Sequence, residues 1–168
     1  MSRAVDRWPP FAVTSLTKNL NVLQELTRDV EKNLEPESRS WLAKLLVIRS
    51  AGIIEQTVAE CSRAYVYSRS GGWVQSFAHS WLERTKNPSP ENLQQFLGRF
   101  DQKLCDEFHL FLTDDSERLY RDLAFLVDRR NRIAHGLSEG VGPQRALELS
   151  EAAVSVADWF VLKLNPKR

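Results

Sequence analysis

The sequence predicts an all-α fold, an antiparallel bundle of about five to six helices. Apolar residues recur at steps of three and four along most of the 168 residues, which is the spacing of one helix face. We find no segment with the apolar–polar alternation of a half-buried strand. Glycine and proline, seven of each, gather at a few joints between the periodic segments. These joints divide the chain into helices.

Three helices are predicted in the first half of the chain. The first covers about residues 14–34, and the second begins after Pro36 and continues to about Ser68. Small residues at 50–52, in the middle of the second helix, would let another helix approach closely. A short amphipathic helix is predicted over residues 73–84.

Three more helices are predicted in the second half. Ser89 is a suitable N-cap, and an apolar stripe without a break predicts one helix from there to Phe111. The fifth helix begins near Asp114 and ends at Gly136, a residue type favoured just past a helix C-terminus. The last helix covers about residues 143–164.

Length and composition indicate one globular domain with a core over about residues 14–164, its first dozen and last few residues being frayed. No run approaches ~18 apolar residues, which argues against a membrane span. The N-terminus lacks the apolar segment of a secretory signal. Cys61 and Cys105 lie far apart and show no metal-ligand spacing. We therefore expect reduced thiols in a cytoplasmic protein that uses no metal and no cofactor.

The net charge of +1 excludes a strongly basic nucleic-acid-binding surface over the whole protein. One local cluster of basic residues exists near the end of the fifth helix, diluted by Asp122 and Asp128. The cluster consists of Arg118, Arg121, Arg129, Arg130 and Arg132. By charge alone, this cluster fits an RNA-binding surface and a solvated helix face with ion pairs equally well.

Arg130 interrupts the apolar stripe of the fifth helix, between Leu126 and Ile133. A guanidinium cannot lose its charge, so Arg130 must pair with a buried acid or open into a cleft. Glu55 interrupts the stripe of the second helix in the same way. We predict that Glu55 lies near Arg130. The alternative is a plain buried salt bridge without chemistry.

His135 lies one turn after Asn131, and Asp128 lies a turn before Asn131. Arg130 and His135 are separated by roughly 140° around an ideal helix, so they would not touch. Either Arg130 reaches around the helix, or the helix loosens near Gly136, or a second chain supplies the missing partner across a twofold axis. A lone histidine near a helix end is usually a partner of the helix dipole.

The segment over residues 126–136 reads Leu-Val-Asp-Arg-Arg-Asn-Arg-Ile-Ala-His-Gly. It resembles the signature of HEPN domains, which is an arginine, a polar residue that is often asparagine, three more residues, and a histidine. The chain most resembles the RiboL-PSP-HEPN branch, found in prokaryotic defence and toxin loci. The resemblance covers about Arg49 to Leu164, and residues 48–55 fit the early long helix of the family.

The resemblance implies a metal-independent endoribonuclease that works as a homodimer and cuts single-stranded RNA at a composite cleft. His135 would be the general acid or base, because imidazole exchanges protons near neutral pH. Arg130 would bind the scissile phosphate, with Arg129 as the fallback, and Asn131 would orient the histidine or the RNA. The expected products carry a 2′,3′-cyclic phosphate and a 5′-OH.

Further residues are expected to support this site. Glu55 and Asp128 would orient the catalytic side chains without entering the chemistry. The candidates for RNA-backbone contacts are Arg121, Arg129 and Arg132.

The sequence leaves other functions open. It contains no glycine-rich phosphate loop, no nucleophile elbow and no His-Glu-x-x-His motif. The main alternative is a non-catalytic module for dimerisation or RNA binding. A third hypothesis, compatible with catalysis, is a subunit regulated by an antitoxin or another defence-system protein.

Overall fold

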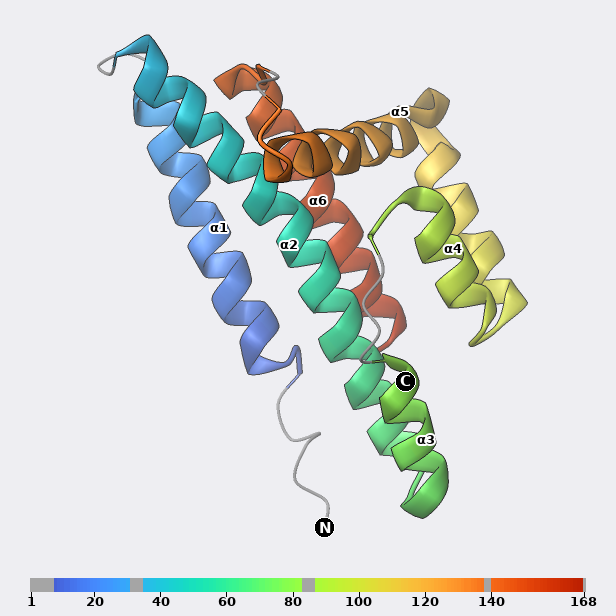
Figure 1. Ribbon diagram of the computed structural model, residues 1–168. Helices are drawn as coiled ribbons and strands as arrows, with labels where there is room; N and C mark the ends of the chain where they lie inside the picture. The colour runs from blue at the N-terminus through green and yellow to red at the C-terminus, as the bar shows by residue number, and fades with distance from the viewer. Residues whose placement is uncertain (1–7, 31–34, 83–86, 138–139, 168) are drawn as a thin grey trace.

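The structure is a computed structural model that describes residues 8–30, 35–82, 87–137 and 140–167. These residues form six α-helices and no strand (Figure 1), which confirms the predicted all-α class. The helices are α1 (Phe11–Val30), α2 (Pro36–Arg69), α3 (Gly72–Leu82), α4 (Pro90–Gly98), α5 (Gln102–Ala134) and α6 (Pro143–Lys163). No helix within the described ranges is long and apolar enough to cross a membrane.

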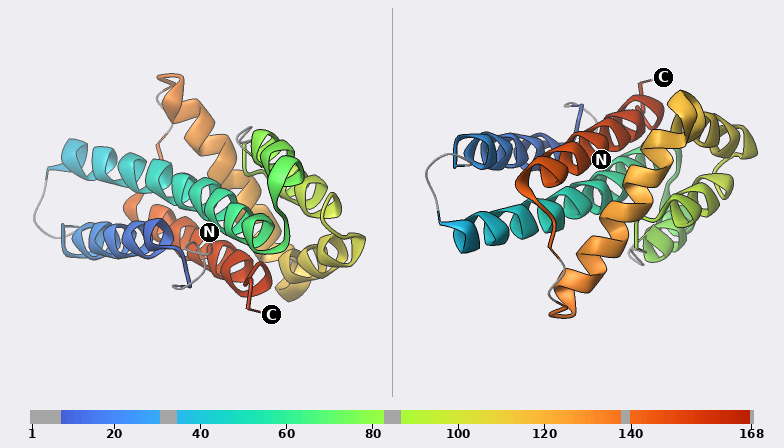
Figure 2. Two further views of the ribbon diagram at one scale, coloured as in Figure 1. Left: turned by 90° about the horizontal axis from the view of Figure 1, so that it is seen from below. Right: turned by 90° about the horizontal axis from the view of Figure 1, so that it is seen from above.

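The helices α1, α2 and α6 lie side by side, with α2 in contact with both of the others (Figure 2). Ser50 and Ala51 of α2 are fully buried, and the Ser50 hydroxyl donates to the Leu46 carbonyl at 2.7 Å. These small side chains sit in the packed interior, as predicted. Gly52 has open space around it and therefore does not mediate a close helix contact.

The predicted fourth helix over 89–111 is wrong in its extent, because the chain turns between α4 and α5. Ser89 does cap α4, accepting from the Asn92 amide at 3.3 Å. However, α4 ends at Gly98, and Asp101 caps the next helix by accepting from the Lys103 amide at 3.0 Å. The apolar stripe continues through the turn because both helices bury residues in the same core, which concealed the break.

A sharp bend at residues 114–117 divides α5 into two parts, close to the predicted start of a helix near Asp114. Asp115, Ser116 and Glu117 have φ values of +50°, +56° and +61°, which is uncommon for non-glycine residues. The first part of α5 packs beside α4, and the second part crosses the bundle and projects past it (Figure 2). The bend thus lets one chain segment contact two sides of the molecule.

The remaining helix ends lie near their predicted positions. The expected ends near residues 34 and 84 fall outside the described residues. Trp8 precedes α1, and its indole donates to the Val161 carbonyl of α6 at 3.1 Å. Residues 1–7 and 168 are not described. Cys61 is buried and Cys105 is half-buried, and both are free thiols. Burial raises the pKa of the Cys61 thiol to about 12, so the unreactive protonated form dominates.

An aromatic cluster fixes the first part of α5 against α6. Phe108 is fully buried, and its ring centroid lies 4.8 Å from that of Trp159 and 5.4 Å from that of Phe160. Such pairs contribute both buried area and ring–ring contact.

Phe108→Ala is expected to lower the free energy of unfolding by about 3–5 kcal/mol, because it leaves a cavity in this cluster. Denaturant-induced unfolding followed by circular dichroism measures the change. The matched control is Phe77→Ala on α3, where the residue is 68% exposed and the change should stay within about 0.5 kcal/mol. Equal losses in both variants would contradict this assignment of the core.

Candidate active site

Arg130 and Glu55 form an ion pair where α5 crosses α2. Nη2 of Arg130 donates to Oε1 of Glu55 at 2.6 Å, and Nη1 donates to Oδ1 of Asn131 at 3.0 Å. The side chains of Arg130 and Glu55 are 30% and 20% exposed. The predicted proximity of the two residues is confirmed. Arg130 is both paired with an acid and open to solvent, so its guanidinium is oriented without being sealed inside the core.

His135 is the C-cap residue of α5 and is exposed to solvent. Its backbone amide donates to the Asn131 carbonyl at 3.1 Å. Gly136 has φ +73°, the left-handed conformation predicted for the residue after the cap. The amides of Gly136 and Leu137 donate to the Ile133 and Arg132 carbonyls at 3.1 and 3.0 Å. This pair of hydrogen bonds is a Schellman motif, and it fixes the position of the helix end.

Arg130 and His135 do not form a contact within this single chain, although both are described. The backbone of α5 remains helical from the bend to Ala134, so it does not loosen before His135. The guanidinium is directed to Glu55 and Asn131. The helix does end at His135 and Gly136, but neither this end nor a reach of Arg130 brings the two side chains together within the chain.

The family model for RiboL-PSP-HEPN matches residues 14–165. The chain belongs to the RiboL-PSP-HEPN family. Membership indicates a ribonuclease-type or RNA-binding domain, of a kind that commonly dimerises. Searches of the curated proteins and of the solved structures found no match.

The arginine cluster of this RiboL-PSP-HEPN domain is divided between ion pairs and ring contacts. Nε of Arg132 lies 3.1 Å from an oxygen of Asp128, while the Arg129 guanidinium lies over the Phe125 ring at 4.6 Å. Nε of Arg129 also lies 3.9 Å from Asp128, so Asp128 pairs with two arginines of the cluster, and no described contact joins it to Arg130 or His135. Arg121 is exposed. The RNA-contact roles of these arginines stay predictions.

Asp122, which dilutes the cluster in the sequence, is buried and turned toward α6. Its Oδ1 accepts from Nη2 of Arg145 at 2.6 Å. This ion pair fixes α5 to α6. Arg118 of the cluster also lies 3.7 Å from Asp122, so this part of the cluster forms ion pairs, but around a buried carboxylate and not on a fully solvated face.

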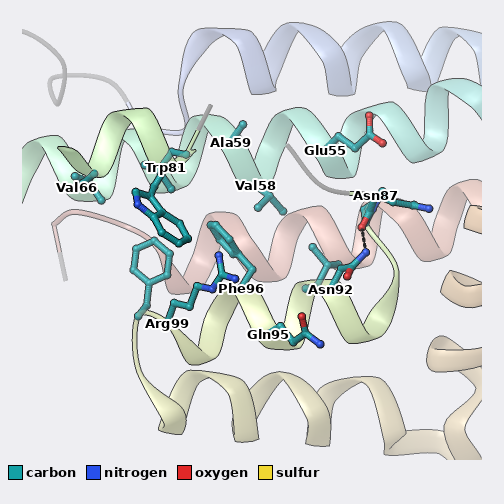
Figure 3. A pocket seen from close by; sticks show the side chains of 15 residues that line it. Glu55, Val58, Ala59, Val66, Trp81, Asn87, Asn92, Gln95, Phe96 and Arg99 are labelled. Atoms are coloured by element: carbon teal, nitrogen blue, oxygen red, sulfur yellow. Dashed lines mark hydrogen bonds between the residues drawn. The ribbon is translucent and has the colours of Figure 1, made fainter. Parts of the chain in front are cut away.

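Sequence reasoning missed a cavity of about 500 Å³ between α2, α3 and α4, which includes Glu55 in its wall (Figure 3). Asn92, Gln95 and Phe96 of α4 and its C-cap residue Arg99 line the cavity, at helical steps of three and four. A helix face that mixes amide, aromatic and guanidinium side chains was the available signal. Among the described residues, no group of three His, Cys, Asp or Glu side chains could hold a metal ion.

A hydrogen bond between α4 and α5 positions one wall of this cavity. The Tyr120 hydroxyl of α5 donates to Oε1 of Glu91, in the first turn of α4, at 2.5 Å. This bond lowers the pKa of the Glu91 carboxyl and raises the pKa of the Tyr120 hydroxyl. The contribution to stability is therefore present above the unfolded glutamate pKa of about 4.3 and is lost as the pH falls through the lower folded value.

Tyr120→Phe is expected to lower the free energy of unfolding at pH 7 by about 0.5–1 kcal/mol, a small value because Glu91 is exposed. The difference from wild type should shrink as the pH falls below about 4. It should also shrink as the pH rises above about 10, through the raised pKa of the tyrosine. Urea unfolding across this pH range measures it. Tyr67→Phe, at an exposed position of α2, is the matched control, and a pH-independent difference for Tyr120→Phe would contradict the role of the bond.

Proposed function

We propose that this protein is a metal-independent endoribonuclease that cleaves single-stranded RNA at a cleft formed by two copies of the chain. The observation that carries the proposal is the Arg130 guanidinium, which Glu55 and Asn131 orient while 30% of the side chain stays exposed. The exposed His135 lies at the same end of α5. An oriented cation and a proton-transfer group are the two parts that RNA cleavage requires.

Arg130 is suited to bind the scissile phosphate. A guanidinium has five N–H donors, and the contacts with Glu55 and Asn131 occupy one each on Nη2 and Nη1. The other donors can bind phosphate oxygens and stabilise the charge that develops on the pentacoordinate phosphorus. Because the guanidinium is already held, little reorganisation is needed when the RNA binds.

His135 is suited to transfer the proton. The imidazole accepts the proton of the ribose 2′-OH, and the 2′-oxygen then attacks the adjacent phosphorus. A bond from O2′ to phosphorus forms, the bond from phosphorus to O5′ breaks, and the leaving O5′ takes a proton from a protonated His135 or from water. The products are a 2′,3′-cyclic phosphate and a 5′-OH. General acid–base catalysis of this kind contributes about 10²- to 10⁴-fold.

A second copy of the chain would bring the two groups together. An exposed apolar stripe of α2 leads toward Glu55 at steps of three and four, and it consists of Trp41, Leu45 and Ile48. Leu137, just past His135, is also exposed at 55%. A twofold contact over this face would bury these side chains and place His135 of one chain near Arg130 of the other.

The alternative function is a non-catalytic module for RNA binding or dimerisation. The observation that favours it is the short Arg130–Glu55 ion pair, which has the geometry of a purely structural salt bridge. We further propose a cytoplasmic toxin or defence effector, with an antitoxin or another defence-system protein as a regulating partner. The family membership supports this proposal.

Purified protein is expected to cleave a mixed-sequence RNA in the presence of EDTA. His135→Ala should reduce the rate by at least about 10²-fold, because the proton-transfer group is lost. Arg130→Lys should reduce it by about 10- to 100-fold, since lysine keeps the charge without the planar donor geometry. Gel analysis and mapping of the RNA ends measure the outcome.

His109→Ala is the matched control, because His109 is exposed on the first part of α5, before the bend. Its activity should equal that of wild type. RNA binding without cleavage by the wild-type protein would favour the module. Equal losses in His109→Ala and His135→Ala would remove His135 from the proposed mechanism.

Mixing Arg130→Ala and His135→Ala proteins is expected to restore cleavage, although each alone is inactive. In a mixed dimer, one chain supplies Arg130 and the other supplies His135. Random exchange of subunits gives at most about a quarter of the wild-type rate, since half of the dimers are mixed and each has one intact pair. Size-exclusion chromatography with mass measurement checks that dimers form. No recovery in a verified mixed dimer would show that each chain uses its own pair.

A further inference from the structure

The cavity beside Glu55 has two chemically different ends (Figure 3). Trp81 and Phe96 form one end, and the ring centroid of Phe100, which also lines the cavity, lies 5.2 Å from that of Phe96. Asn87 and Asn92 lie with Glu55 at the other (Figure 3). Its volume of about 500 Å³ falls in the range of about 300–1,000 Å³ typical of small-ligand sites. A planar ligand with an aromatic face and a polar edge matches this arrangement.

The polar groups around the cavity include some that the fold does not use. The Gln95 amide is exposed and forms no hydrogen bond with the described residues. Oδ1 of Asn87 is buried and also lacks a partner among them. Asn92, in contrast, donates from Nδ2 to the Asn87 carbonyl at 2.9 Å, which fixes the segment before α4. Gln95 therefore offers both donors and an acceptor to a ligand.

A guanidinium lies near each end of the cavity. The Arg99 guanidinium lies over the Trp81 ring, 5.0 Å from its centroid, at the aromatic end. Arg130 lies beyond the other end, where Glu55 belongs both to the cavity wall and to the ion pair. One cation at each end of a cavity with an aromatic wall matches the phosphates that flank a base in a nucleic-acid chain.

We propose that this cavity binds one unpaired nucleobase of the RNA whose scissile phosphate lies at Arg130. The base stacks on the aromatic end, and Gln95 hydrogen-bonds to its edge. A free nucleotide carries the same base chemistry, but the shared residue Glu55 places the cavity directly beside the proposed cleavage site. The assignment to substrate RNA rests on the proposed function, whereas the recognition of a nucleobase does not.

The wall formed by α3 is held weakly enough to admit a base. None of its residues is buried, and α2 is the one described helix with which it makes substantial contact. Gly72 begins α3 with φ +57°, so a glycine lies at the junction between the two helices. Elements with few buried contacts open at low free-energy cost.

Binding of short labelled oligonucleotides to His135→Ala protein tests the proposal without cleavage. The probes are hexamers of rA, rC and rU, followed by fluorescence anisotropy. We expect one hexamer to bind more tightly than the others. Ala78→Phe fills the cavity from α3 and should weaken that binding more than about tenfold and abolish the preference. Gln95→Leu should weaken the preferred hexamer alone, by about fivefold for one lost hydrogen bond.

Gln94→Leu is the matched control, because Gln94 is next in sequence but lies near His109 of α5, at 3.4 Å, and not in the cavity wall. The Gln94→Leu variant should bind every hexamer as tightly as the protein without this change. Thermal unfolding checks that each variant is folded, and Gln95→Leu tests the proposal if Ala78→Phe does not fold. The proposal would be overturned if the His135→Ala protein bound all three hexamers equally. It would also be overturned if Ala78→Phe and Gln95→Leu both kept the base preference of that protein.

Competition by free nucleotides separates the two sources of the base. Displacement of the preferred hexamer by AMP, CMP or UMP would support a cavity that binds a base of the RNA substrate. A nucleotide that binds in the cavity without displacing RNA would overturn the assignment to substrate and identify a free ligand instead. Because all of these measurements use binding alone, a wild-type protein that fails to cleave RNA contradicts the proposed function and leaves the result for the cavity unaffected.

Discussion

The ion pair between Arg130 and Glu55 is the interaction on which the rest of the site depends. It joins the middle of α2 to the projecting end of α5, at a distance of 2.6 Å. Removing one partner from such a pair leaves a poorly solvated charge, so the two residues depend on each other. The pair also limits where the guanidinium can point. The position of the arginine is thus set by the core helix of the bundle, while the position of His135 is set by the end of α5.

The sequence was most informative where a residue conflicted with its surroundings. Arg130 and Glu55 each interrupt an apolar stripe, and that shared conflict was enough to predict their contact across 75 residues. Helix ends marked by local chemistry were also predictable, because Ser89 and Gly136 act through their own backbone and side-chain preferences. These features depend on the type of one or two residues.

Features that depend on several segments were not predictable. The turn after Gly98 is concealed because the apolar stripe continues through it, and only the packing of both helices on one core defines the break. The cavity requires α2, α3 and α4 at once. The direction in which Arg129 and Arg132 point depends on Asp128 and Phe125, contacts that the sequence does not specify.

Gly136 makes no side-chain contact, and a β-carbon added there would meet nothing within 4 Å. The constraint on this position is therefore the handedness of its backbone and not the space around it. A residue with a β-carbon would have to bear roughly 1–2 kcal/mol of left-handed strain or release the last turn of the helix. Gly136 thus holds the end of α5, and with it His135, through a torsion angle, and asparagine, which tolerates that angle, is its nearest substitute.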